Sequence, residues 1–304
     1  MPSVSSVEEA AAVLGAAHAD GGKLRIGVDL TADGLDRILE HDPGDLTCTV
    51  EAGVRLSVLR ERLAAAGQRL SLDPPGDPTI GGLLAQNLSG PLRHGFGAAR
   101  DLVLGATLVL GDGTIASSGG KVVKNVAGYD IARLVCGSEG RLAFVARASF
   151  RLHPLPRSAG TLVVETEDAA AIVAVLLGSQ LQPSALDVLH PGRVALLFEG
   201  SERGVEAQLT SARGHVGGTE ADMSVWDESR RRQGASNGRV RFAPGDLAAV
   251  LETLTDAVIR PAAGVAYTAL ESASDNLSQA PLEGTEALVE RIRRELDPRG
   301  VLAG

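Results

Sequence analysis

Hydrophobic and polar positions alternate in short blocks along this chain, and their periods predict both strands and short helices. A period near 3.6 indicates a helix with one buried face, and a period of two indicates a half-buried strand. Helical periods cover residues 5–18, 33–40, 55–66, 80–87, 125–134, 168–177, 204–214, 222–233, 244–257 and 282–296. Strand periods cover residues 23–30, 46–51, 100–110, 114–117, 141–152, 161–165, 185–189, 193–199 and 239–242.

The order of these elements predicts an α+β fold in two domains. In the first half, strands and short helices alternate, and the Gly111-Asp112-Gly113 turn sends one strand back antiparallel, so a repeated parallel βαβ array is not indicated. A proline-rich junction at 153–157 divides a domain of residues 1–156 from one of residues 157–304. The second half begins β-α-β-β-α, which predicts a smaller α/β cap domain of ferredoxin-like type that carries the C-terminal helix.

The densest motif lies between Asp73 and Gly90. Three prolines stiffen its first six residues, and Thr79 is a favourable N-cap for a helix over 80–87. Gly81 and Gly82 in the first turn cost about 1 kcal/mol each relative to alanine. Either these glycines let the helix pack closely on a strand, or they present uncovered N–H groups to a ligand; the flanking sequence favours a ligand.

Four glycine-rich segments fall between residues 76 and 140. They are 79–82, 90–97, 118–121 and 136–140. So many loops with exposed backbone in one domain predict an extended ligand held largely by main-chain contacts. A dinucleotide bound outside a Rossmann fold fits that description.

Several other chemistries are disfavoured by the same residues. Residues 95–100 hold two of three Rossmann glycines but lead into a strand, and Gly120-Lys121 lacks the rest of a Walker loop. Residues 136–140 nearly match a nucleophile elbow but begin with Cys136. The six histidines show no pair at metal-binding spacing, so no metal site is predicted.

Composition narrows the class further. The 304 residues are 44% hydrophobic and carry a net charge of −9, which argues against a nucleic acid partner. The basic run 230–232 is flanked by acidic residues and is interpreted as a solvated helix face. Cys48 and Cys136 suit a reducing compartment. No secretion signal is recognised and the apolar stretches are too short to span a membrane, so a cytoplasmic protein is predicted.

The motifs of the first half resemble a known family. The strings are Asp73-Pro74-Pro75, Thr79-Ile80-Gly81-Gly82, Ser89-Gly90-Pro91-Leu92-Arg93-His94, Arg100-Asp101, Gly119-Gly120-Lys121-Val122-Val123-Lys124-Asn125-Val126-Ala127-Gly128-Tyr129-Asp130 and Gly137-Ser138-Glu139-Gly140. Together they resemble the FAD-binding (PCMH-type) family of vanillyl-alcohol oxidase and p-cresol methylhydroxylase, and within it the FAD-binding subunits of the glycolate oxidase type. The similarity extends from about Asp36 to Pro156.

The resemblance implies a two-subdomain FAD-binding fold followed by a cap over the flavin. FAD would be the cofactor of an oxidoreductase that removes a hydride from a small 2-hydroxy acid, with a second flavoprotein subunit and an iron–sulfur subunit as partners. The cofactor-binding residues carried over are Pro75, Thr79, Ile80, Gly81, Gly82, Asn87, Ser89, Gly90, Asp101, Ser138 and Gly140. No catalytic base is identified; His190 and Arg241 are chemically suited to a carboxylate substrate.

The sequence also departs from the family. A Gly-Gly-Gly-Thr loop that wraps the FAD diphosphate is expected early in the chain, yet only residues 20–23 occupy that region, and Asp20 would bring an unfavourable negative charge. A later Gly-Thr-Leu-Gly pattern stands as Gly140-Arg141-Leu142-Ala143. Three hypotheses therefore stay open: an FAD-dependent oxidoreductase subunit, a non-catalytic scaffold subunit that keeps the fold but has lost FAD binding through the shortened first loop, and an unrelated ligand-binding protein.

Overall fold

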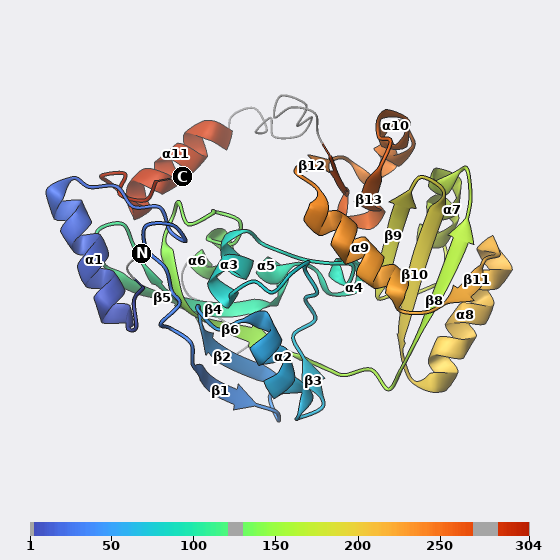
Figure 1. Ribbon diagram of the computed structural model, residues 1–304, viewed down its shortest axis with the longest axis horizontal. Coiled ribbons are helices and arrows are strands. Elements are labelled where there is room, and N and C mark those ends of the chain that lie inside the picture. The colour runs from blue at the N-terminus through green and yellow to red at the C-terminus, as the bar shows by residue number, and fades with distance from the viewer. Residues whose placement is uncertain (1–2, 121–129, 270–284, 304) are drawn as a thin grey trace.

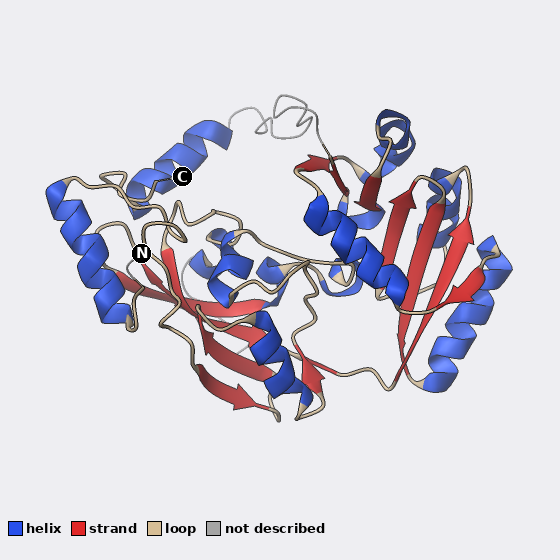
Figure 2. Cartoon of the chain, in the orientation of Figure 1, coloured by secondary structure: helices blue, strands red, loops and turns tan. Residues whose placement is uncertain are grey.

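The chain folds around two separate β-sheets, each with helices packed on it (Figure 1, Figure 2). The computed structural model describes residues 3–120, 130–269 and 285–303. A five-stranded sheet belongs to the first region, residues 3–156, and a seven-stranded sheet to the second region, residues 157–269. The predicted α+β class is confirmed.

The first sheet has the strand order β1-β2-β6-β4-β5, and all its neighbours pair antiparallel. Its strands are β1 (Ile38–Asp42), β2 (Thr47–Glu51), β4 (Val103–Val109), β5 (Ile115–Gly119) and β6 (Phe144–Arg151), and β3 (Gln68–Arg69) pairs separately with β7 (His153–Pro154). The predicted hairpin is confirmed, because β4 and β5 pair from Gly105 opposite Gly119 to Val109 opposite Ile115. Val50, Leu108 and Phe150 from three of these strands share one buried core.

Side chains cap the start of three described helices of the first region, from Ser6, Thr79 and Asp130. The described helices of this region are α1 (Val7–Asp20), α2 (Leu56–Ala64), α3 (Ile80–Ala85), α4 (Arg93–Phe96), α5 (Ala99–Leu102) and α6 (Ile131–Leu134). Ser6 accepts a hydrogen bond from the N–H of Glu9 at the start of α1, and Asp130 accepts one from Arg133 at the start of α6. The first part of the helix predicted over 125–134 lies outside the described residues.

Two predictions in this region are wrong. Residues 23–30 form no strand but a tight turn in which the carbonyl oxygen of Arg25 accepts from Val28, Asp29 and Leu30. Residues 33–40 form no helical turn, because β1 begins at Ile38. In both segments tertiary contacts outweigh a weak local pattern: Leu24 bridges to Leu302, some 280 residues away in the sequence.

The second sheet is antiparallel with the order β11-β8-β10-β9-β13-β14-β12. Its strands are β8 (Ser158–Glu165), β9 (Ala185–His190), β10 (Arg193–Gly200), β11 (Thr219–Ala221), β12 (Gly238–Arg241), β13 (Ala257–Arg260) and β14 (Val265–Thr268). The predicted β-α-β-β-α run is present as β8, α7 (Ala169–Leu177), β9, β10 and α8 (Glu202–Val216). Further strands extend this run. The helix predicted over 244–257 is shorter in the structure, where it forms η1 (Pro244–Asp246) and α10 (Leu247–Thr253), and its last predicted residue begins β13.

Alternate side chains of the second sheet belong to two cores. Leu162, Val164 and Leu196 pack with α7, α8 and α10 on one face. Val163 and Leu197 pack on the opposite face with Trp226 of α9 (Ser224–Ala235). In Figure 1, α9 lies between the second sheet and the first region.

The C-terminal helix packs on the first region, although the sequence groups it with the second. α11 (Thr285–Leu296) is followed by Val301 and Leu302, which are buried beside the residues of α1. The buried carboxylate of Asp297 accepts from the N–H groups of both residues at 2.8 Å. Arg299 donates to the carbonyl oxygen of His18 at the end of α1. The boundary between residues 156 and 157 remains a proposal.

Direct polar contacts hold the two regions together. Arg69 forms a two-pronged ion pair with Glu199, whose oxygens lie 2.7 and 2.6 Å from its nitrogens. Gln233 of α9 donates to the carbonyl oxygen of Ser89 at 2.9 Å and accepts from Arg260, which is 1% exposed. Because these bonds are shielded from water, they fix how α9 sits against the loop that follows α3.

Candidate functional site: a cavity between the two regions

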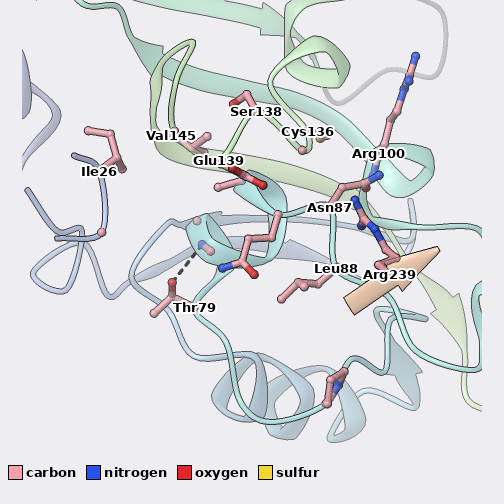
Figure 3. A pocket seen from close by; sticks show the side chains of 18 of the residues that line it. Ile26, Thr79, Asn87, Leu88, Arg100, Cys136, Ser138, Glu139, Val145 and Arg239 are labelled. Carbon is pink, nitrogen blue, oxygen red and sulfur yellow. Dashed lines mark hydrogen bonds between the residues drawn. The ribbon is translucent and has the colours of Figure 1, made fainter. Parts of the chain in front are cut away.

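A cavity of about 1540 Å³ lies where the two regions face one another (Figure 3). Helix α3 and the loop after α6 form one wall, and β12 and β14 contribute to the other. Ligand pockets typically measure roughly 300–1,000 Å³. The cavity is therefore large enough for an extended ligand together with a small second molecule.

The start of α3 is built differently from the sequence expectation. Ile80 donates its N–H to the carbonyl oxygen of Val54 at 2.9 Å, and Gly81 donates to that of Ala52 at 2.7 Å. Gly82 donates to the Thr79 hydroxyl at 3.2 Å, as the predicted N-cap requires. All three N–H groups are thus engaged, so the expectation that this helix start offers uncovered donors is wrong.

The two glycines of α3 do different things. A Cβ added at Gly81 would lie 3.1 Å from the Cβ and 3.2 Å from the carbonyl oxygen of Ala52, so Gly81 permits close packing at the end of β2. A Cβ at Gly82 would meet only the Thr79 hydroxyl, at 3.3 Å. Of the two alternatives posed by the sequence, only close packing is therefore present, at Gly81. Gly81 serves packing, and Gly82 leaves bare backbone on the cavity wall.

The end of α3 is joined to a loop some 50 residues later in the chain. Gly137 donates its N–H to the carbonyl oxygen of Leu84, and Glu139 donates to that of Ala85, at 3.0 and 2.8 Å. The backbone φ angle is +86° at Gly137, +55° at Glu139 and +79° at Gly140, a left-handed conformation that suits glycine. Two segments that the sequence identifies separately as glycine-rich therefore form one continuous wall.

The early loop of the cavity lies later in the chain than the sequence analysis places it. Gly21 caps α1 with a φ angle of +68°, and residues 20–23 do not line the cavity. The lining residues from this part of the chain are Ile26, Gly27, Thr31, Ala32 and Asp33. Asp33, not Asp20, is therefore the acidic side chain of the early loop at the cavity. Its carboxylate accepts from the Thr31 hydroxyl at 2.9 Å.

Most of the carried-over residues gather at this cavity. Those that line it are Pro75, Thr79, Gly81, Gly82, Asn87, Asp101, Ser138 and Gly140. Ile80, Ser89 and Gly90 are buried behind the wall and do not line it. Asn87 and Asp101 also hold neighbouring backbone in place, because Asn87 accepts from the N–H of Arg100 and Asp101 accepts from that of Ala98.

The opposite wall carries positive side chains from the second region. Arg239 and Arg241 are two residues apart on β12, so both side chains lie on the same face of the strand and line the cavity with Tyr267 of β14. Figure 3 shows Arg239 pointing from the second region toward Asn87. Burial lowers the pKa of the Arg241 guanidinium, and the positive charges of Arg239 and Arg93 lower it further. Such crowding of like charges favours an anionic ligand.

The two second-region candidates from the sequence separate in space. Arg241 lines the cavity, but the His190 ring bonds to the carbonyl oxygen of Leu254 at 2.8 Å and does not. The sequence analysis does not identify Arg239 as a candidate. Its position two residues before Arg241 in a predicted strand indicates that both side chains lie on one face, and this was the available signal. Cys136 lines the cavity, and burial raises the pKa of its thiol to about 12, so it is protonated at neutral pH.

The residues present fit an FAD-like ligand. Bare backbone at Gly82 and Gly137 gives a smooth surface for close approach, since a Cβ at Gly137 would meet only Asn87, at 3.5 Å. Arginine side chains at the cavity could neutralise a diphosphate. Among the described residues, no cluster of three metal-binding side chains occurs, and no helix is long and apolar enough to cross a membrane.

Comparison with known proteins agrees with this geometry. Residues 4–119 match the family described as FAD binding domain. The chain is similar to glycolate oxidase subunit GlcE of Escherichia coli, with 35% identity over 203 residues that cover 64% of this chain and 56% of that protein. It is also similar to glycolate oxidase subunit GlcD of Bacillus subtilis, with 38% identity over 181 residues that cover 56% of this chain and 37% of that subunit. The chain thus spans only part of the length of these relatives.

A solved structure shares the fold over nearly the whole chain. Alkyldihydroxyacetonephosphate synthase superposes with a TM-score of 0.73 at 16% sequence identity, covering 98% of this chain and 75% of that one. At this identity the similarity concerns the fold alone. It extends beyond the segment matched by the FAD binding family, so the second region also follows a known arrangement.

Proposed function

We propose that this chain, whose residues 4–119 match an FAD binding domain, binds FAD and is a subunit of an FAD-dependent oxidoreductase that oxidises a small 2-hydroxy acid. The observation that carries the substrate class is the arginine pair on β12, which lines the same cavity as the glycine wall of α3. FAD, when bound, accepts the hydride that such an oxidation releases.

In this proposal one wall of the cavity binds the cofactor and the other binds the substrate. Gly82 and the 137–140 loop would hold the cofactor through close backbone approach, and Pro75 and Thr79 would bound the same surface. Arg239 and Arg241 would bind the carboxylate of the substrate, since a guanidinium matches a carboxylate with two parallel hydrogen bonds. Fixing the carboxylate would orient the α-carbon toward the opposite wall.

The similarity to GlcE and GlcD, both named as subunits of glycolate oxidase, supports assembly with partner subunits. A second flavoprotein subunit and an iron–sulfur subunit that receives the electrons are the partners we propose. This division would place oxidation and onward electron transfer in different chains.

A second candidate function is a non-catalytic, FAD-binding subunit of the same kind of complex. The observation that favours it concerns proton acceptors on the second-region wall. The described residues that this region contributes to the cavity include no histidine, aspartate, glutamate or lysine, the side chains that most often accept a proton in catalysis. A 2-hydroxy acid must lose its hydroxyl proton during oxidation, so a group able to accept it is needed.

The visible spectrum of the purified protein separates the two. We expect a flavin absorption band after addition of FAD, and bleaching of that band when D-lactate or glycolate is added without oxygen. A band that stays oxidised with every 2-hydroxy acid tried would support the non-catalytic candidate. If no FAD binds, both candidates are wrong for the chain as it stands alone.

A further inference from the structure

A second, smaller cavity lies at the joint between the two regions. Its volume is about 310 Å³, and it is lined by Arg60 of α2, the loop 74–76 and the α9 residues Asp227, Arg230, Arg231 and Gly234. A Cβ added at Gly234 would lie 3.0 Å from the Cβ of Pro75, so the loop and α9 are in contact beside this cavity. Neither the flavin chemistry nor the proposed function assigns it a role.

The charges around this cavity do not balance. Three arginines face one aspartate, and the guanidinium group is positive at every physiological pH. Arg230 is paired with Asp227 at 2.6 Å and with Asp73 at 3.3 Å. Arg231 makes no ion pair with any residue that the structure describes, so its charge is left uncompensated.

Arg60 is the second arginine of this cavity that makes no direct ion pair with any residue the structure describes. One guanidinium nitrogen of Arg60 donates to the carbonyl oxygen of Leu72 at 2.8 Å, so a neutral group, not a carboxylate, accepts this hydrogen bond. Burial lowers the pKa of Arg60 and the charge of Arg230 lowers it further, while the charges of Asp73 and Asp77 counteract part of this. A positive side chain in such surroundings gains stability when an anion binds next to it.

The basic run on α9 is therefore more than a solvated face. The helix predicted over 222–233 is confirmed, but Arg230 and Arg232 are only 30% and 22% exposed and both form ion pairs. Arg231, between them, is exposed and lies at the cavity. The interpretation of residues 230–232 as a simple solvated surface is thus wrong for two of the three residues.

We propose that this second cavity binds a small oxyanion of the phosphate type, either free phosphate or a phosphate monoester. Arg60 and Arg231 would each direct guanidinium N–H groups at the oxyanion, an arrangement in which charge-assisted hydrogen bonds are strong. The volume of 310 Å³ is about ten times the ~30 Å³ that a water molecule occupies in the liquid, so it leaves room for a small organic group.

Occupation of this cavity would affect the larger one. Pro75 and Gly234 line both cavities. The anion would connect α2 in the first region with α9 in the second, and so add a contact that holds both walls of the larger cavity in place. Two regions joined by a small polar interface are expected to move relative to one another. Bound phosphate should therefore slow this motion.

Calorimetric titration of the whole protein with inorganic phosphate tests the proposal, with chloride adjusted to keep ionic strength constant. We expect saturable binding that Arg231→Gln and Arg60→Gln each weaken by roughly tenfold or more, the loss expected for a hydrogen bond to a charged group. Arg62→Gln is the matched control, because Arg62 lies on α2 and does not line either cavity. Methyl phosphate in place of phosphate distinguishes a site for a monoester from a site for the free ion.

Phosphate could also enter the larger cavity, and Arg239→Gln distinguishes this case. If Arg239→Gln weakens phosphate binding and Arg231→Gln does not, the anion binds in the larger cavity and the proposal is overturned. Equal binding to the wild type and Arg231→Gln would overturn it as well. Because Arg231 is exposed, this variant should fold even if Arg60→Gln does not. None of these outcomes depends on flavin reduction, so they are separate from the test of the proposed function.

Discussion

The two walls of the large cavity are made in different ways. The wall from the first region consists of backbone, with bare glycine at position 82 and a left-handed turn at 137–140 docked on the end of α3. The wall from the second region consists of side chains on the edge strand β12, where Arg239 and Arg241 project from a single face. A wall made of glycine backbone tolerates few substitutions, whereas a position on a strand accepts many different side chains.

This difference is consistent with where similarity to other proteins occurs. The match to the FAD binding domain covers residues 4–119, within the first region, while the second region is matched mainly through its fold. It suggests that the backbone wall determines which cofactor binds, and the side-chain wall determines which small molecule meets it. Four measurements test this division, beginning with the largest expected effect.

Replacing the bare glycine of the backbone wall should abolish cofactor binding. Gly82→Val places a branched side chain where only the Thr79 hydroxyl is near, so it fills the space open to the ligand and leaves the core untouched. We expect FAD affinity to fall by roughly 100-fold or more, about 2.7 kcal/mol, with little change in thermal stability. Gly214→Val on α8 is the control, because a Cβ there meets nothing within 4 Å and lies away from the cavity. Unchanged flavin content in Gly82→Val would mean that the cofactor does not contact α3.

Changing the side-chain wall should affect the substrate but not the cofactor. In Arg239→Gln one guanidinium is lost from the carboxylate site, so the concentration of 2-hydroxy acid needed for half-maximal flavin bleaching should rise by roughly 10- to 100-fold. FAD affinity, measured by titration of the flavin absorbance, should stay within about twofold. Arg239→Lys keeps the positive charge but loses the planar guanidinium that can form two parallel hydrogen bonds. The concentration of 2-hydroxy acid it needs should therefore lie between those of the wild type and Arg239→Gln. A large loss of FAD affinity in Arg239→Gln would break the proposed division.

Removing the acidic group of the early loop should strengthen cofactor binding. The carboxylate of Asp33 lies at the cavity, and a diphosphate would be repelled by it. Asp33→Asn keeps the size of the side chain and should tighten FAD binding by a few fold, more strongly at low than at high salt. Asp36→Asn is the control, because Asp36 is exposed and does not line the cavity. Equal effects of the two substitutions would indicate only a change in net charge.

The smallest expected effect concerns the joint between the walls. Burial raises the pKa of Asp73 to about 6, and the positive charges of Arg260 and Arg230 and the N–H of Leu92 offset only part of that rise. A folded-state pKa above the unfolded value means that this carboxyl contributes most to stability below about pH 4, and that its contribution is lost as the pH rises through about 6. Urea unfolding between pH 4 and 7 should therefore show a shallower pH dependence in Asp73→Asn. An unchanged slope would show that Asp73 does not titrate in this range.

Much of the first region could be predicted from local chemistry. Thr79 caps α3 as expected, the turn at 111–113 pairs β4 with β5, and the glycine-rich segments carry residues that line the cavity. The hydrogen-bond partners of these residues were harder to predict than the residues themselves. The N–H groups of Gly81 and Ile80 bond to Ala52 and Val54, partners that only the folded chain brings to the start of α3.

The sequence by itself determined the fold class, most helices and strands and the glycine-rich wall, because caps, turns and left-handed glycines act over a few residues. Tertiary structure alone decided that Asp33 replaces Asp20 at the cavity, that Leu302 pairs with Leu24, and that Arg239 faces Asn87. These contacts join residues far apart in the chain. Their formation depends on how whole sheets and helices pack, which no local pattern of hydrophobic and polar positions records.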